Sequence, residues 1–74
     1  MNALLDKVRD VKKTRGLAVE SVRDELNKHY LHEDDKVTFH TVSKWMSSKA
    51  APMGESVLAL QEWASANHIY ETGQ

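Results

Sequence analysis

The segment 38–49 combines side chains of two kinds at helical spacing, and it is the part of the chain best suited to bind another molecule. A helix here, turning by about 100° per residue, would be apolar on the side formed by Phe39, Val42, Trp45 and Met46. Its opposite side would be polar and weakly basic, with His40, Lys44 and Ser47 flanked by Thr41, Ser43 and Ser48. Imidazole, ammonium and hydroxyl groups can hydrogen-bond to base edges and phosphates in the DNA major groove. The same residues are also common on solvent-exposed helices, so this segment alone leaves both interpretations open.

A metal site is the second chemistry that the residue types suggest. His29 and His32 have the spacing of two ligands, and the acidic residues 33–35 and His40 follow closely. The two imidazoles would share a helix face only if the helix continued through Leu31, and the chain has no cysteine to complete a tight site. We interpret these residues as surface histidines and expect no metal.

Catalysis has little support in the sequence. No serine lies in a nucleophile-elbow context, and no glycine-rich phosphate loop is present. A helical domain of 74 residues also has little room for a catalytic pocket. We therefore predict that the protein is not an enzyme and uses neither a cofactor nor a small-molecule substrate.

Length and composition predict a single soluble domain. The 74 residues are enough for one small core, which we expect over 1–69 with a C-terminal tail over 70–74. The absence of cysteine excludes a disulfide scaffold and thiolate zinc sites. No apolar run approaches the ~20 residues that cross a membrane, and the first residues lack the apolar segment of a signal peptide. We expect a cytoplasmic protein that does not bind membranes.

The charges are segregated along the chain, although the net charge is only −1. Residues 36–52 contain three basic residues and no acidic one, whereas residues 17–35 contain two basic and six acidic residues. A domain of this kind can present a positive face to phosphates, but its weak net charge predicts modest non-specific affinity for DNA.

Periodicity and stop signals predict an all-α domain of four to five helices. We expect helices over 3–15, 18–30 and 38–49, and a fourth from 54 or 55 to 67 or 68. Gly16 is suited to end the first helix, Thr38 to cap the third, and Pro52 to prevent its continuation. The segment 31–37 breaks the helical pattern and contains an acidic turn.

The predicted helices have apolar faces that can share one core. The first two helices contribute Leu4, Leu5, Val8, Val11, Val19, Val22, Leu26 and Tyr30. In the fourth, the predicted stripe consists of Val57, Leu60 and Ala64, with Met53 and Trp63 at its edges. Leu58 and Ile69 lie off that stripe, so they are candidates for contact with a partner.

The first helix is rich in basic residues, namely Lys7, Arg9, Lys12, Lys13 and Arg15. Cations in the last turn of a helix interact favourably with the helix dipole, and this explains the positions of Lys12, Lys13 and Arg15 without a partner. Phosphate binding explains them equally well, and the sequence does not decide between the two.

The order of these segments resembles the lambda-repressor-like (XRE) helix-turn-helix family of bacterial and phage regulators. The resemblance covers about residues 4–64 and is carried by segments 4–16 and 17–26, the run Val42-Ser43-Lys44-Trp45, Lys49, Pro52, and the run Val57-Leu58-Ala59-Leu60. It implies a compact helix-turn-helix fold in which Val42 and Trp45 anchor the recognition helix in the core. It also implies that His40, Thr41, Lys44 and Ser47 face DNA.

Three features depart from the family pattern. The predicted turn over 31–37 is seven residues long and has no glycine, whereas this motif normally has a turn of three or four residues. Arg23 occupies the position where a small residue is usual in the second helix, and Ser48 stands where glycine is usual. The longer turn makes the angle between the two helices an open question.

From the residues and the resemblance together, we expect a sequence-specific regulator of transcription, a repressor from a phage or a bacterium, that places helix 38–49 in the major groove of double-stranded DNA. The predicted DNA-binding residues are His40, Thr41, Ser43, Lys44, Ser47, Lys49, Lys13 and Arg15. The predicted core anchors are Val42, Trp45, Met46 and Leu60.

Two further expectations concern partners. Regulators of this type commonly bind inverted repeats as two-fold dimers, and we expect a homodimer formed through Leu58, Ile69 and Tyr70, although these side chains could equally pack under the C-terminal tail. The alternative function is that of a small phage-type module that uses the same scaffold to bind a host protein, which the weak net charge and the acidic second segment would suit.

Overall fold

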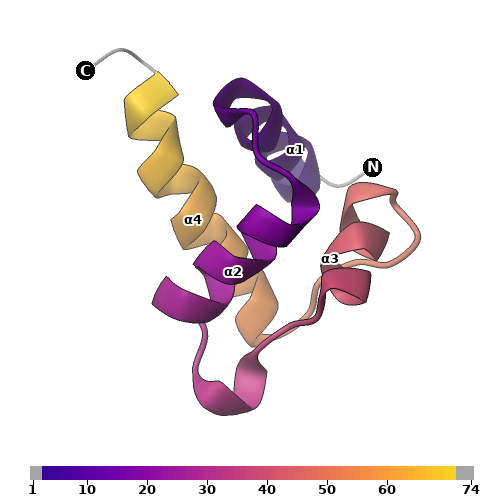
Figure 1. Ribbon diagram of the computed structural model, residues 1–74. Helices are drawn as coiled ribbons and strands as arrows, with labels where there is room; N and C mark the ends of the chain where they lie inside the picture. Colours follow the sequence, from indigo (N-terminus) through magenta and orange to yellow (C-terminus); the bar gives the residue numbers. More distant parts are fainter. Residues whose placement is uncertain (1–2, 72–74) are drawn as a thin grey trace.

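The computed structural model describes the backbone of residues 3–71 and the side chains of residues 3–67. The described residues form four α-helices and one short 3-10 helix (Figure 1), namely α1 (Ala3–Arg15), α2 (Val19–His29), η1 (Glu33–Asp35), α3 (Phe39–Met46) and α4 (Glu55–Glu71). No strand occurs among them, which confirms the prediction of an all-α fold. In this part of the chain, no helix has both the length and the apolar character needed to cross a membrane.

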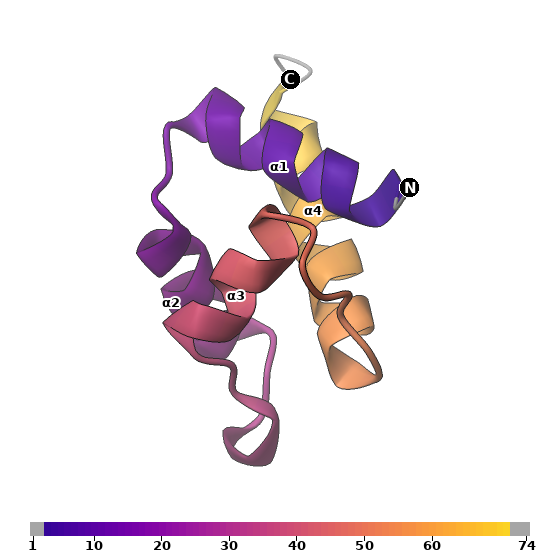
Figure 2. The same ribbon diagram turned by 90° about the vertical axis from the view of Figure 1, so that its right-hand side faces the viewer.

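The helices pack in two pairs that share one core. The most extensive packing is between α1 and α4, and the next is between α2 and α3. When the molecule is turned by 90°, α3 faces the viewer with α4 behind it, and the C-terminal end of α3 points toward α1 (Figure 2). The helix α3, which corresponds to the predicted helix 38–49, is therefore an outer element of the domain.

The core is built from apolar residues of all four α-helices. The fully buried side chains are those of Val8, Val11, Val22, Leu26, Val42, Leu60 and Trp63. The prediction that Trp63 lies at the edge of the α4 stripe is wrong, since its exposed fraction is 0%. The buried side of α4 is centred on Leu60, Trp63, Ala64 and Asn67, whereas Val57 is only half-buried.

α1 ends at a glycine, as predicted. Gly16 has a φ of 67°, in the left-handed region where only glycine carries no steric cost. The amide of Leu17 donates to the carbonyl of Lys12 at 2.9 Å, and the amide of Gly16 donates to that of Lys13 at 3.1 Å. These two bonds form a Schellman motif, which turns the chain into α2.

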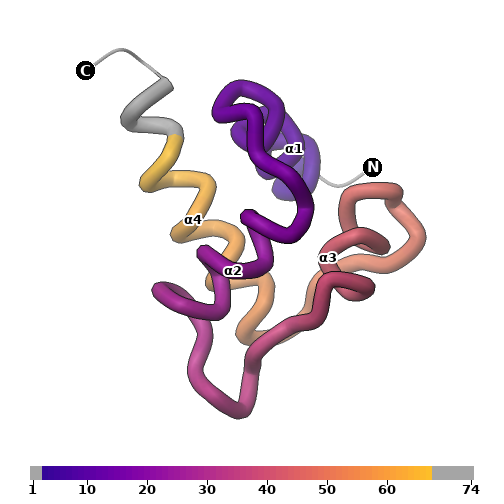
Figure 3. Tube along the Cα trace, viewed as in Figure 1, coloured from indigo at the N-terminus to yellow at the C-terminus, as the bar shows by residue number. Residues whose placement is uncertain are grey.

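The connection between α2 and α3 is longer than the turn predicted over 31–37, because α2 ends at His29 and α3 begins at Phe39 (Figure 3). Its acidic part forms η1, and Leu31 is buried against the core. Asn27 closes the connection from α2: its side-chain amide donates to the carbonyl of Val37, and its Oδ1 accepts from the amide of Val37, both at 2.9 Å. The two ends of the segment are thus tied to each other.

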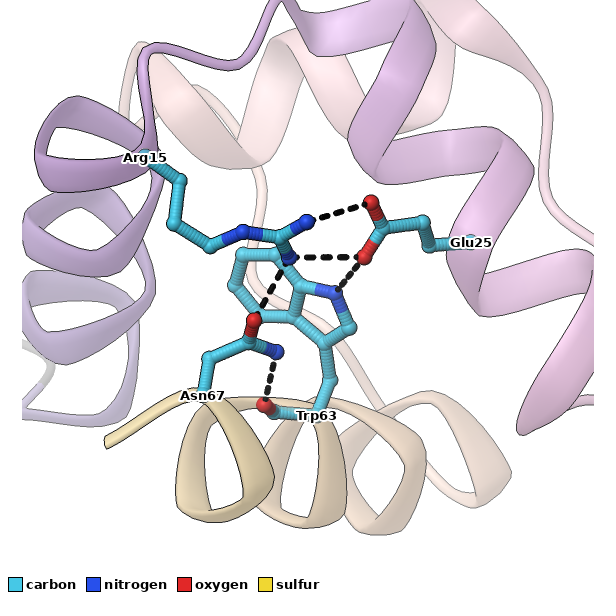
Figure 4. Close-up of polar contacts among 4 residues, drawn as sticks. All are labelled: Arg15, Glu25, Trp63 and Asn67. Atoms are coloured by element: carbon cyan, nitrogen blue, oxygen red, sulfur yellow. Dashed lines mark hydrogen bonds and ion pairs between the residues drawn. The ribbon is translucent and has the colours of Figure 1, made fainter. Parts of the chain in front are cut away.

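A polar network joins α1, α2 and α4 (Figure 4). Arg15 Nη1 donates to Glu25 Oε1 at 2.9 Å and also to Asn67 Oδ1, and Arg15 Nη2 donates to Glu25 Oε2 at 3.1 Å. The indole N–H of Trp63 donates to Glu25 Oε1 at 2.9 Å, and Asn67 Nδ2 donates to the carbonyl of Trp63 at 2.7 Å. We refer to Arg15, Glu25, Trp63 and Asn67 as the junction network.

The charge of Glu25 depends on its partners in this network. Partial burial raises the pKa of the Glu25 carboxyl, but the hydrogen bonds from Arg15 and Trp63 and the positive charge of Arg15 oppose that effect. The net result is a pKa below the ordinary value of 4.5. Glu25 is therefore held as a carboxylate that accepts hydrogen bonds from Arg15 of α1 and Trp63 of α4.

Candidate nucleic-acid interface

One side of α3 is fixed in the core. Val42 and Trp45 are buried, and Met46 is half-buried and packs against the same cluster. Leu60 of α4, also predicted as a core anchor, is completely buried. These contacts determine which side of the short helix is left for solvent.

Phe39, which its spacing places on the apolar side of the helix, does not belong to this buried side. It remains 49% exposed. The buried side of α3 is centred between Val42 and Trp45, and Phe39 lies roughly 90° around the helix from that centre. The first turn of α3 therefore presents an aromatic ring at the border of the exposed side.

The exposed side of α3 consists of the residues that the spacing predicts. His40, Lys44 and Ser47 are exposed, and Thr41 and Ser43 are half-buried at its two edges. We refer to these five residues as the polar face of α3. Its side chains are short or flexible, so a flat or grooved surface can approach the helix backbone.

Hydrogen bonds inside α3 occupy two of the hydroxyls on this face. The Thr38 side chain caps the helix by accepting from the amide of Thr41 at 3.2 Å, and the hydroxyls of Thr38 and Thr41 are 3.1 Å apart. The hydroxyl of Ser47 donates to the carbonyl of Ser43 at 3.0 Å. No ion pair of Lys44 occurs in the described part of the chain, so its ammonium is the cationic donor of the polar face.

α3 ends earlier than predicted, at Met46 instead of near Lys49. Ser48 adopts a φ of 63°, and its amide donates to the carbonyl of Trp45 at 3.2 Å. The amide of Lys49 donates to the carbonyl of Lys44 at 2.8 Å, which completes a second Schellman motif with serine in the position that favours glycine. Lys49 is exposed just beyond this turn, beside the end of the polar face.

Arg9 of α1 contacts this turn directly. Its Nε donates to the carbonyl of Met46 at 2.8 Å, and its Nη2 donates to the carbonyl of Trp45 at 2.9 Å and to Ser48 Oγ at 2.6 Å. Its Nη1 pairs with Asp6 at 3.0 Å. We refer to Arg9, Trp45, Met46 and Ser48 as the α3 clamp.

The two basic residues predicted on α1 are on different sides of that helix. Lys13 follows Arg9 by four residues, so it lies on the side of α1 that faces the end of α3, and it is exposed. Arg15 is bound into the junction network instead, with Glu25 and Asn67 as partners. Lys13 is thus exposed on α1, whereas Arg15 is committed to a structural contact with α2 and α4.

Sequence reasoning missed the long-range contacts of Arg9 and the contact of Asn27 with Val37. Arg9 binds main-chain atoms of residues far along the chain, and Asn27 binds main-chain atoms of an irregular turn. Such partners leave no periodic pattern in the sequence. The two histidines considered as metal ligands do not share a helix face, because α2 ends at His29. Within the described residues, no group of three or more side chains of the metal-binding types converges.

The residues predicted for a dimer interface are only partly described. Leu58 is 55% exposed on α4, in agreement with its position off the core stripe. Met53 is 80% exposed in the segment before α4. The side chains of Ile69 and Tyr70 lie outside the described residues.

Comparisons of the chain with protein-family models, with curated proteins and with solved structures gave no match.

Proposed function

We propose that this protein binds double-stranded DNA in a sequence-specific way, with α3 in the major groove, and that it regulates transcription as a repressor. The observation that carries the proposal is the division of α3 into a buried side and a polar face, with Lys44 at the centre of that face and without an ion pair among the described residues. In the proposal, α2 and α3 act as a helix-turn-helix with an enlarged turn.

The dimensions of α3 support this use. An α-helix with its side chains is about 10–12 Å in diameter, which fits the major groove of about 12 Å width, and the eight residues of α3 span about 12 Å along the helix axis. The polar face has no acidic residue, and the acidic residues nearest to it along the sequence precede α3 in η1. Lys49 at the end of the polar face and the exposed Lys13 of α1 are suited to contact phosphates, while Lys44 and His40 are suited to contact base edges.

The first experiment is a selection of random DNA fragments followed by sequencing, which should enrich one motif. Binding to the selected DNA should then be measured for Lys44→Ala and for Lys28→Ala, since Lys28 is an exposed lysine of α2 outside the polar face. We expect a loss of roughly tenfold to hundredfold for Lys44→Ala, typical of a good base contact of ~1–3 kcal/mol. Equal losses for both variants would reduce the effect to general electrostatics and contradict base reading by Lys44.

A homodimer on an inverted repeat is part of the proposal, because one monomer contacts too few base pairs for useful discrimination. The exposed Leu58 on α4 is the described residue best suited to such a contact. Leu58→Glu should leave a folded monomer and weaken binding to the full repeat but not to a half-site. Light scattering that finds the parent monomeric on its full repeat would exclude the dimer.

A second candidate function, binding to a host protein, is favoured by one observation. Phe39 exposes half of its surface next to the polar face, and such an aromatic ring is typical of protein interfaces. The salt dependence of binding separates the two functions. DNA binding through phosphates weakens steeply with added salt, whereas binding through an apolar ring does not.

A further inference from the structure

We propose that Arg9 is a positioning residue for DNA reading, which holds the last turn of α3 against α1 and does not itself contact phosphate. This inference rests on the proposed function. Arg9 is one of five basic residues of α1, and its position alone would suggest contact with phosphate.

The donors of Arg9 are matched to the end of α3. A guanidinium presents Nε and Nη2 along one edge, and here this edge meets two consecutive main-chain carbonyls, those of Met46 and Trp45. These carbonyls belong to the last turn of the helix, where main-chain acceptors have no partner within the helix itself. A positive charge at this end also interacts favourably with the helix dipole.

The same contacts leave Arg9 with little capacity for a phosphate. Nε and Nη2 donate to α3 and Ser48, and Nη1 donates to Asp6. The side chain is 30% exposed, and its charge is already paired with a carboxylate. Lys13, one helical turn further along α1, has no ion pair in the described part of the chain and is the better phosphate contact.

The clamp acts on the residues proposed to read DNA. The carbonyl of Lys44 accepts from the amide of Lys49 at 2.8 Å, directly beside the carbonyls held by Arg9. Ser48, whose hydroxyl accepts from Arg9, is the left-handed residue that directs Lys49 away from the helix axis. Because α3 has only eight residues, loosening this turn disturbs Lys44 and Ser47, two of the five residues of the polar face.

The test uses two variants. Arg9→Lys keeps the positive charge but loses the paired Nε and Nη2 donors, and Arg9→Met keeps much of the aliphatic part of the side chain. In the protein without DNA, both variants should accelerate hydrogen exchange of the Ser48 and Lys49 amides about tenfold or more, as expected for a lost charged hydrogen bond. The amides in the middle of α4 should exchange at nearly the parent rate. Ser48→Ala, which removes only the hydroxyl acceptor, should have a smaller effect at the same amides.

The DNA measurement separates positioning from direct contact. We expect Arg9→Lys to weaken binding to the selected DNA about tenfold, and we expect most of this loss to vanish in a Lys44→Ala, Lys49→Ala background. Undiminished loss in that background would show that Arg9 contacts DNA itself and overturn the inference. Parent-like exchange at Ser48 and Lys49, or parent-like DNA binding by Arg9→Lys, would also overturn it. Failure of the parent to enrich any DNA sequence would overturn the proposed function together with this inference.

Discussion

Two arginines of α1, six residues apart, hold two different parts of the molecule by different means. Arg15 joins side chains of α2 and α4 in the junction network, where its partner Glu25 is ionisable. Arg9 reaches α3 through main-chain carbonyls, which carry no titratable proton, and its one carboxylate partner, Asp6, belongs to α1 itself. The contacts of the two arginines show that basic residues on one helix need not form one phosphate-binding surface. These contacts also predict that the two regions respond differently to mutation and to pH.

The largest expected effect is in the junction network. Trp63 is completely buried and donates a hydrogen bond to Glu25, so Trp63→Ala removes core volume and also one partner of a carboxylate. We expect a loss of about 3–5 kcal/mol in the free energy of unfolding, which is most of the stability of a domain of this size. Urea unfolding followed by far-UV circular dichroism measures it, with Met53→Ala as an exposed control. A change for Trp63→Ala as small as that for the control would show that the junction network is not part of the stable core.

The next effect is the pH dependence of the junction network. The folded pKa of Glu25 is depressed, so its contribution is fully present above the unfolded value near 4.5 and is lost as the pH falls through the lower folded pKa. Glu25→Gln should lower stability at pH 7 by about 1–2 kcal/mol, a range already reduced because the carboxylate is partly exposed.

The stability of Glu25→Gln should also fall less steeply than that of the parent when the pH is lowered below 4.5. Glu62→Gln, at an exposed position of α4, is the matched control. Affinity for the selected DNA at pH 7 should be the same for all three proteins. Parallel pH profiles for parent and Glu25→Gln would mean that another carboxyl group determines the acid sensitivity.

The extent to which the sequence predicts this fold depends on how local the responsible interactions are. The start of α1, the stop at Gly16 and the cap at Thr38 follow from neighbouring residues, and the structure has all three. The division of α3 into two sides also follows, because Val42 and Trp45 mark the buried side by their spacing.

The remaining features depend on partners far along the chain. Arg9 contacts residues 36, 37 and 39 positions away, and Arg15 contacts Glu25 and Asn67, which are 10 and 52 positions away. The helix-dipole rule treats the cations of the last turn of α1 alike, so it cannot distinguish Lys13 from Arg15. The buried position of Trp63 likewise depends on how α4 is rotated against α1 and α2, which periodicity along α4 alone leaves open.

A smaller effect is expected at the α3 clamp. Ser48 adopts the left-handed conformation, which costs an L-residue about 1–2 kcal/mol, and its hydroxyl accepts a hydrogen bond from Arg9. Ser48→Ala loses that bond and keeps the strain, whereas Ser48→Gly loses the bond but relieves the strain. We therefore expect the glycine variant to be more stable than the alanine variant by about 1 kcal/mol in urea unfolding. Equal stability would mean that the turn rearranges when the hydroxyl is removed.

The smallest effect is expected from the acidic residues of η1, because this segment lies at the end of the molecule away from α1 (Figure 1). Lys13 belongs to α1, and Lys44 and Lys49 belong to the turn that Arg9 of α1 contacts. Glu33 is already paired with Lys36 at 3.1 Å. Replacing Glu33, Asp34 and Asp35 by Gln, Asn and Asn removes three negative charges. We expect these charges to lie farther from the DNA phosphates than the distance of about 8 Å over which physiological salt screens them. Affinity for the selected DNA should rise less than about threefold at physiological salt, with no change in the preferred sequence. A gain of tenfold or more, or a new preferred sequence, would place η1 in the interface and require α3 to dock by its N-terminal end.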